Sequence, residues 1–270
     1  MEKDIIGFGI AGNFAHHLEQ AGESADFVDV VVDEEDAPKG IFPTYVPYHD
    51  SFLGTYPFSS KKIAYLEGKN LQVEPEVGLL CDVRYEDGKI SALLPRRFMA
   101  YNDCSIRVEG AKKISHKKNW GEDSKGVSQD TIAIDSFREG GVMDGYSLTS
   151  FIKRGEKIIQ YGENSALLGY SYFYEKLEKW MIQKLNQQKD TGPLEDLQAL
   201  LSAASYPKNL LISIGATRYT EFGEHHFLER GDILYVIVYP HKKIKHEEII
   251  PMIKENHFAL GISTLIQEVV

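Results

Sequence analysis

The sequence has 270 residues, of which 43% are hydrophobic and 26% are charged, a composition typical of a globular protein that buries a sizeable core. Its formal net charge of −10 argues against nucleic-acid binding, because contact with phosphates requires clustered cations. The N-terminus carries acidic residues and no apolar run approaches the roughly 20 residues of a membrane span, so we expect a cytoplasmic protein without a membrane segment.

The expected elements of the first half are mostly strands. A strand at 5–10 precedes a short helix at 13–19 and a β-like run at 27–32. From about residue 42 to residue 151, short apolar or alternating segments are separated by Gly, Pro, Asn and Asp, a spacing typical of a mainly β structure. These segments are 62–66, 72–85, 89–93 and 131–134.

Helices are expected mainly in the second half. Apolar residues at helical spacing predict helices at 166–187 and 193–204, and a terminal helix is expected at 247–255. Strands are expected at 210–214 and 233–239. The pattern as a whole predicts an α+β, mainly β fold.

Two cysteines and one basic run are expected to be structural features only. Cys81 and Cys104 have no metal-type spacing, so we expect two small buried residues rather than a disulfide or a metal site. The basic run from Lys112 to Lys118 is expected to be a solvated loop.

The first short motif with a possible ligand is glycine-rich. Gly7, Gly9 and Gly12 form the G-x-G-x-x-G pattern of a dinucleotide-binding turn, with Asp33 some 20 residues later. A nucleotide-binding sheet needs strands that alternate with crossover helices, and residues 40–165 offer strands without them. The alternative is that the glycines allow a tight turn and close packing.

The second motif is acidic. Glu74 and Glu76 fall in an expected strand, where residues two apart point to the same face of the sheet. Two adjacent carboxylates repel each other unless a cation or a proton lies between them. This arrangement therefore favours a hard metal ion with oxygen ligands.

Two later segments extend this motif. Asn102-Asp103-Cys104-Ser105-Ile106-Arg107 follows the acidic strand, and Lys125 comes some twenty residues after Asp103. In order and spacing these segments resemble the fumarylacetoacetate hydrolase superfamily, metal-dependent enzymes that act on oxo acids and diketo acids. The resemblance implies that Glu74, Glu76 and Asp103 bind Mg²⁺ or Mn²⁺, that Lys125 lies in the pocket, and that Arg107 is the motif arginine.

The resemblance covers roughly residues 5–240. The segment 9–17 looks like the amino-terminal G-x-N-Y-x-x-H segment of that superfamily and places His17 at its catalytic histidine. The segment 153–162 resembles the R-x-G-x-x-x-Q-x-G hairpin of the superfamily. Thr217 falls on the threonine of a G-T-P motif, and 227–233 resembles an L-x-P-G-D-x-I turn. The implied fold is a mixed β-roll or sandwich with peripheral helices, in a single domain spanning 1–270. A helical insert at about 166–206 and a C-terminal extension at 241–270 lie outside the common pattern.

Three positions depart from the superfamily pattern. Members with a His-Glu pair on a closing lid have glutamate three residues after the histidine, where this chain has Gln20. Gly110 replaces a glutamine, and Arg218 replaces the proline of G-T-P, either as a solvated charge or as an added contact for an anion.

The resemblance implies a hydrolase or lyase that cleaves a C–C bond of a small 2-oxo or diketo acid. The metal would polarise the substrate and stabilise the enolate that forms when the neighbouring bond breaks. Lys125 would stabilise the developing negative charge, and His17 would act as general base. Arg107 and Thr217 would contact the substrate, although Arg107 would alternatively brace the metal loop.

Two other functions and an assembly state complete the expectations. The chain would alternatively be a non-catalytic metal-binding or metabolite-binding relative, or a dinucleotide-binding protein through its glycines. A homodimer is the usual assembly of the superfamily. The expected helix at 166–187 also carries more aromatic residues than a surface helix needs: Tyr170, Tyr172, Phe173 and Trp180.

Overall fold

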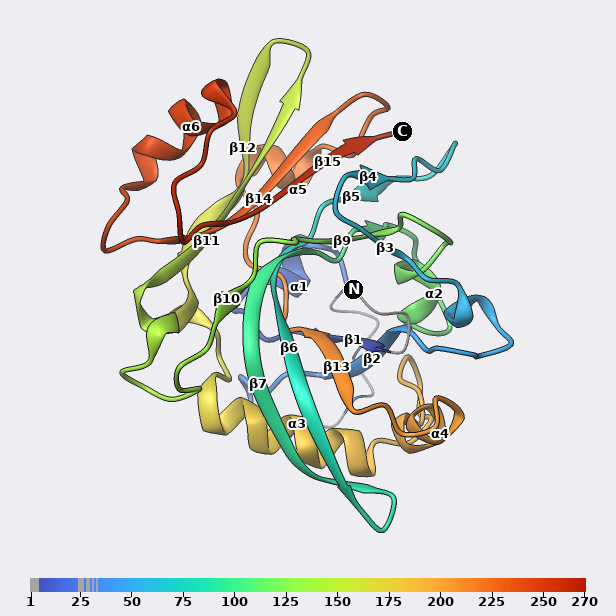
Figure 1. The fold of residues 1–270 in the computed structure, drawn as a ribbon. Coiled ribbons are helices and arrows are strands. Elements are labelled where there is room, and N and C mark those ends of the chain that lie inside the picture. The colour runs from blue at the N-terminus through green and yellow to red at the C-terminus, as the bar shows by residue number, and fades with distance from the viewer. Residues whose placement is uncertain (1–4, 24–26, 28–29, 31, 33) are drawn as a thin grey trace.

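The structure is a computed structural model that describes residues 5–23, 27, 30, 32 and 34–270 (Figure 1). The β-like run expected at 27–32 falls partly, and Asp33 wholly, outside these residues. Within the described part, strands predominate and few helices are long, which confirms the expected α+β, mainly β fold class.

The larger of the sheets carries the acidic motif. It contains eight strands in the order β2-β1-β13-β6-β7-β9-β3, with β10 paired to β7. Its centre is the long antiparallel hairpin of β6 and β7, which turns at Asp87 and Gly88, both with positive φ as such tight turns require. The strands of this sheet are β1 (Ile6–Ala11), β2 (Gly40–Tyr45), β3 (Phe58–Ser59), β6 (Pro75–Glu86), β7 (Lys89–Asn102), β9 (Lys125–Val127), β10 (Ile132–Ala133) and β13 (Asn209–Ser213).

A second sheet of five strands has the order β12-β11-β14-β15-β4, and a separate pair joins β5 to β8. Figure 1 shows the five-stranded sheet beside one end of the β6–β7 hairpin. The remaining strands are β4 (Lys62–Ile63), β5 (Leu71–Gln72), β8 (Ser105–Ile106), β11 (Tyr146–Arg154), β12 (Lys157–Ala166), β14 (Ile233–Pro240) and β15 (Ser263–Val269).

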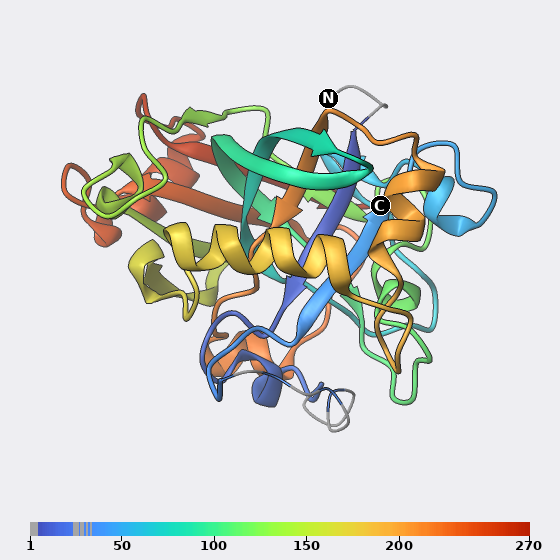
Figure 2. The same ribbon diagram turned by 90° about the horizontal axis from the view of Figure 1, so that it is seen from below.

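Helices cover the outer faces of the sheets. Figure 2 shows α3 lying across the larger sheet, and α6 packs on the smaller sheet through Ile249 and Ile253. None of the described helices is long and apolar enough to span a membrane. The helices are α1 (His17–Gln20), α2 (Ser115–Lys118), α3 (Tyr174–Gln187), α4 (Leu197–Ala203), α5 (Glu221–His225) and α6 (Ile249–Glu255), with short 3-10 turns η2 (Phe52–Gly54), η3 (Val142–Gly145), η4 (Leu167–Gly169) and η5 (His246–Glu248).

The helix expected at 166–187 begins eight residues late. Ala166 ends β12, and the chain reaches α3 only at Tyr174, because Asn13 holds the intervening segment in a non-helical form. The amide nitrogen of Asn13 donates to the carbonyl oxygen of Tyr172 (3.0 Å), and its side-chain oxygen accepts from the backbone N–H of the same residue (2.9 Å). Tyr170, Tyr172 and Trp180 are buried within the chain's own core with 5% exposure each, and Phe173 packs against that core partly buried. They therefore no longer support the expected homodimer, which stays a prediction.

The glycine-rich segment is a strand and a turn, not part of a nucleotide-binding sheet. In the part of the chain that the structure describes, β1 is followed by the four-residue α1 and pairs antiparallel with β2, so no crossover helix follows it. A Cβ on Gly9 would lie 2.4 Å from Cζ of Phe42, and Gly12 has a φ of +73°. Close packing and a turn explain both glycines, and the dinucleotide alternative loses its structural basis.

Candidate metal centre

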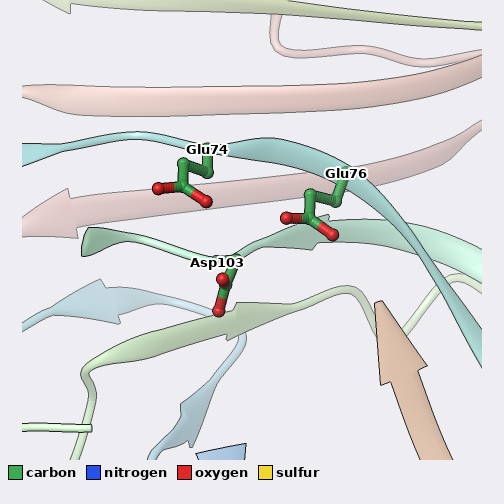
Figure 3. Close-up of side chains that lie close together, drawn as sticks. All are labelled: Glu74, Glu76 and Asp103. Atoms are coloured by element: carbon green, nitrogen blue, oxygen red, sulfur yellow. The ribbon is translucent and has the colours of Figure 1, made fainter. Parts of the chain in front are cut away.

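The three acidic residues of the motif come from two neighbouring strands. Glu76 lies near the start of β6, Glu74 just precedes that strand, and Asp103 follows the end of β7. The two strands pair as far as Pro75 and Asn102, and beyond them the backbone N–H of Asp103 donates to the carbonyl oxygen of Glu74 at 3.0 Å. Figure 3 shows Glu74 and Glu76 projecting side by side near Asp103.

The carboxylates form one buried group of oxygen donors. Glu74, Glu76 and Asp103 have exposures of 3%, 1% and 0%, and one ligand atom from each lies within 4.8 Å of the others. Hard cations such as Mg²⁺ and Mn²⁺ prefer carboxylate oxygens. The donor set therefore fits the divalent metal ion that the sequence predicts.

Electrostatics also favours a cation at this position. Burial, together with the charges of Asp103 and Glu74, raises the pKa of Glu76 well above its ordinary value. One oxygen of Glu76 accepts from the backbone N–H of Gly215 at 2.8 Å, which fixes the carboxyl group but does not neutralise it. A divalent cation among these oxygens would relieve the repulsion.

Cationic side chains surround the group. The Nζ atom of Lys118 lies 2.6 Å from Glu74 Oε2 and 2.7 Å from Asp103 Oδ2, and Nζ of Lys125 lies 3.3 Å from Asp103 Oδ1. Burial opposes ionisation of Glu74, but the charges of Lys118 and Arg107 hold its pKa below the ordinary value. Burial lowers the pKa of Lys125, against the opposing effect of Asp103.

Arg107 braces the site from one side. Its guanidinium donates to Glu23 at 2.6 Å, to Gln72 at 2.5 Å and to the hydroxyl of Tyr219 at 2.9 Å, and it lies 2.8 Å from Glu74 Oε1. This arrangement supports the bracing role that the sequence left open. Contact with a substrate stays a prediction.

The expectation of a solvated basic loop is wrong for its last two residues. Lys117 and Lys118 are each 2% exposed, because α2 packs against β2 and β8 and directs both side chains inward. Lys117 pairs with the buried carboxylate of Glu23 at 2.8 Å. Lys118 and Glu23 are the main residues that sequence reasoning missed. The available signal was the apolar Ile114 and Trp120 on either side of the lysines.

His17 lines the same small pocket as Glu74 and Glu76, and its catalytic role stays a prediction. It is 3% exposed, and neither ring nitrogen has a hydrogen-bond partner among the described residues. Burial is the main cause that lowers its pKa to about 4. The imidazole is therefore neutral at neutral pH.

Gln20 does not orient this ring. Its amide nitrogen donates to the carbonyl oxygen of Tyr219 and to Glu224, both at 3.2 Å, and its amide oxygen accepts from the backbone N–H of Tyr219 at 2.9 Å. A glutamate at position 20 would meet the carboxylate of Glu224 rather than His17. The position that carries glutamate in the superfamily thus has a structural use here.

The remaining candidates lie close to the strand that carries the acidic motif. Thr217 is 1% exposed, and its backbone N–H donates to the carbonyl oxygen of Pro75 at 3.2 Å. Arg218 is half-buried, and its guanidinium Nε lies 3.0 Å from Oε2 of Glu163, an ion pair that the sequence did not predict. A small pocket adjoins the acidic group, and its lining includes Gly12, His17, Glu23, Glu74, Glu76 and Lys118.

Comparison with other proteins gives one family and one relative at the sequence level. A family described as "Family of unknown function (DUF5718)" matches residues 23–269. An uncharacterized protein of Schizosaccharomyces pombe is 25% identical over 135 residues, which are 50% of this chain and 21% of that protein. The chain thus spans about a fifth of the length of this relative.

Several solved structures are similar in fold to this chain. A 2-keto-3-deoxyarabinonate dehydratase has a TM-score of 0.59 at 14% identity, over 98% of this chain and 73% of that chain. A structure of 2-keto-3-deoxy-D-arabinonate dehydratase complexed with magnesium and 2,5-dioxopentanoate has a TM-score of 0.55 at 15% identity, over 98% and 72%. For a structure described as "a putative fumarylacetoacetate isomerase/hydrolase from Oleispira antarctica", the TM-score is 0.50 at 12% identity, over 98% of this chain and 93% of that chain. These likenesses confirm the fumarylacetoacetate hydrolase-like fold, in a divergent form.

Proposed function

This chain belongs to the DUF5718 family of unknown function, and we propose that it is an enzyme that holds one Mg²⁺ or Mn²⁺ ion and cleaves a C–C bond of a small 2-oxo or diketo acid. The observation that carries the proposal is the buried group of Glu74, Glu76 and Asp103, with ligand atoms within 4.8 Å of one another. A protein of the same fold that is complexed with magnesium and an oxo acid adds support.

The chain's own residues suit each part of this chemistry. Glu74, Glu76 and Asp103 would hold the metal, which when bound supplies Lewis acidity toward the oxygens of an oxo acid. The ammonium of Lys125, which lies 3.3 Å from Asp103, would stabilise negative charge that develops on the substrate. Arg107 would keep Glu74 charged and correctly oriented.

His17 would accept a proton at an imidazole nitrogen, but its position makes it a weak base. Its pKa of about 4 means that the neutral imidazole holds a proton poorly, and no carboxylate hydrogen-bonds to its ring among the described residues. A general base works best with a pKa near the operating pH. We therefore propose that decarboxylation of an oxaloacetate-type acid is faster than hydrolysis of an acylpyruvate, which requires deprotonated water.

Activity assays test the proposal on the metal-depleted chain. We expect oxaloacetate decarboxylation that depends on added Mn²⁺ or Mg²⁺, that falls strongly in Lys125→Met and that changes little in His17→Gln. Acylpyruvate hydrolysis should be slow under the same conditions. Efficient acylpyruvate hydrolysis would contradict this account of His17.

A thermal-shift panel separates the alternatives. Stabilisation by Mn²⁺ with oxalate, but without turnover of either acid, would identify a non-catalytic metal-binding protein, the reading favoured by the different use of Gln20. Stabilisation by NAD(P) alone would revive the dinucleotide alternative. We also propose a cytoplasmic homodimer, which sedimentation would test at micromolar concentration.

A further inference from the structure

Lys118 lies between two of the three proposed metal ligands. Its Nζ atom is 2.6 Å from Glu74 Oε2 and 2.7 Å from Asp103 Oδ2, and the side chain is 2% exposed. The same two carboxylates belong to the group of three that would hold a divalent metal ion. The ammonium therefore takes up the position of a cation that both residues bind.

Contacts of the neighbouring residue and of the ammonium itself position Lys118 in the metal-free chain. The next residue, Asn119, donates from its amide to the carbonyl oxygens of Thr44 at 2.9 Å and Thr55 at 3.0 Å. The Nζ atom also lies 5.1 Å from the centre of the Phe42 ring. These contacts set the backbone and the charged end of the side chain.

The chain's own cations already offset the negative charges of Glu74 and Asp103. Lys118 pairs with both carboxylates, Lys125 pairs with Asp103, and Arg107 pairs with Glu74 as well as with Glu23. A divalent ion would add two positive charges within a few ångströms of Lys118. Since the site is buried, water screens this repulsion little.

We propose that Lys118 is a built-in cation that balances the carboxylates and is displaced when a divalent metal ion binds. This inference rests on the metal site of the proposed function. The carboxylate of Glu23, which already pairs with Arg107 and Lys117, lines the same small pocket as Lys118 and is the acidic group toward which the displaced ammonium would move. Lys118 thereby weakens metal binding and stabilises the metal-free chain.

Calorimetric titration of the full, EDTA-treated chain with Mn²⁺ alone tests the proposal. In Lys118→Met the affinity for Mn²⁺ should rise roughly 10-fold or more, because one like charge leaves a poorly screened site. Its melting temperature in EDTA should fall, and added Mn²⁺ should raise it by more than in the wild type. Lys113→Met, in the same basic run, is the control, since its ammonium pairs with Asp190 rather than with the proposed ligands or with Glu23, and its affinity should match the wild type.

A second variant covers the case in which Lys118→Met does not fold in EDTA. Lys118→Gln also removes the charge but keeps a donor for the carboxylates, and a variant that folds only with Mn²⁺ supports the proposal. Wild-type affinity or weaker binding in both Lys118 variants overturns it and leaves the proposed function standing. Absence of Mn²⁺ binding in every variant and in the wild type overturns both.

Discussion

The acidic segment at the start of β6 and the glycine-rich turn after β1 carry the two strongest short motifs of the chain, and they line the same small pocket. At the acidic segment, later parts of the chain add a third carboxylate, that of Asp103. They also add three cations, which are Arg107, Lys118 and Lys125. At the glycines, distant parts add the ring of Phe42, which fills the space that a Cβ on Gly9 would need. The role of a short motif therefore depends on the residues that the rest of the fold places around it.

The largest effect is expected when Arg107, which braces the acidic segment, is removed. Arg107→Ala leaves Glu74 and Glu23 buried without their guanidinium partner, and we expect a loss of about 3 to 5 kcal/mol in the free energy of unfolding. Arg96→Ala is the control, because its pair with Asp82 is exposed and contributes about 0 to 1 kcal/mol. Urea unfolding measures both, and equal losses would show that the buried charges do not hold this region together.

The pH dependence of stability probes the pocket itself. The charged groups that face His17 are Glu74, Arg107, Glu23 and Lys118. Because burial lowers the pKa of His17 from 6.5 to about 4, the unfolded chain takes up its proton first as the pH falls. The contribution of His17 to the free energy of unfolding is therefore complete above pH 6.5 and is lost as the pH falls toward about 4.

Between pH 6.5 and 4, the free energy of unfolding of the wild type should fall by about 3 kcal/mol more than that of His17→Gln, with both proteins in EDTA. Urea unfolding at several pH values gives the difference directly. A difference that stays constant between pH 6.5 and 4 would mean that the ring is not buried as a neutral group.

A smaller effect tests the glycine side of the comparison. Gly9→Ala would place a Cβ 2.4 Å from Cζ of Phe42, and such overpacking costs about 1 to 3 kcal/mol. Gly145→Ala is the control, because the nearest atom, Cδ of Lys242, is 3.8 Å from its new Cβ. Unfolding measurements and a thermal shift with NAD(P) check this together. An unchanged stability of Gly9→Ala with stabilisation by NAD(P) would favour a ligand role for the turn.

The sequence predicted those parts of the site that depend on local geometry. Glu74 and Glu76 are two residues apart at a strand, and Asp103 closes a short motif, so their proximity follows from β pairing between two consecutive strands. Lys118 could not be found in this way. Its burial depends on the carbonyl oxygens of Thr44 and Thr55, which hold Asn119 from far along the chain.

The same distinction applies to the fold. The strand expected at 89–93 continues to Asn102 because a bulge at Arg96, next to Pro95 and facing Leu80 and Cys81, accommodates the proline within the hairpin. The helix expected from Ala166 is delayed by hydrogen bonds to Asn13, more than 150 residues away. Local periodicity predicted the kinds of element, whereas long-range contacts set these boundaries.

Calorimetric titration of Asp103→Asn with Mn²⁺ tests whether the three buried carboxylates form a metal centre. Asn keeps the size of the side chain but removes one of the three charged ligands, and Asp82→Asn, an exposed carboxylate of the same sheet, is the matched control. We expect one Mn²⁺ per chain in the wild type and in the control, and no measurable binding in Asp103→Asn with its fold intact by circular dichroism. Unchanged Mn²⁺ affinity in Asp103→Asn would contradict the assignment of Glu74, Glu76 and Asp103 as a metal centre.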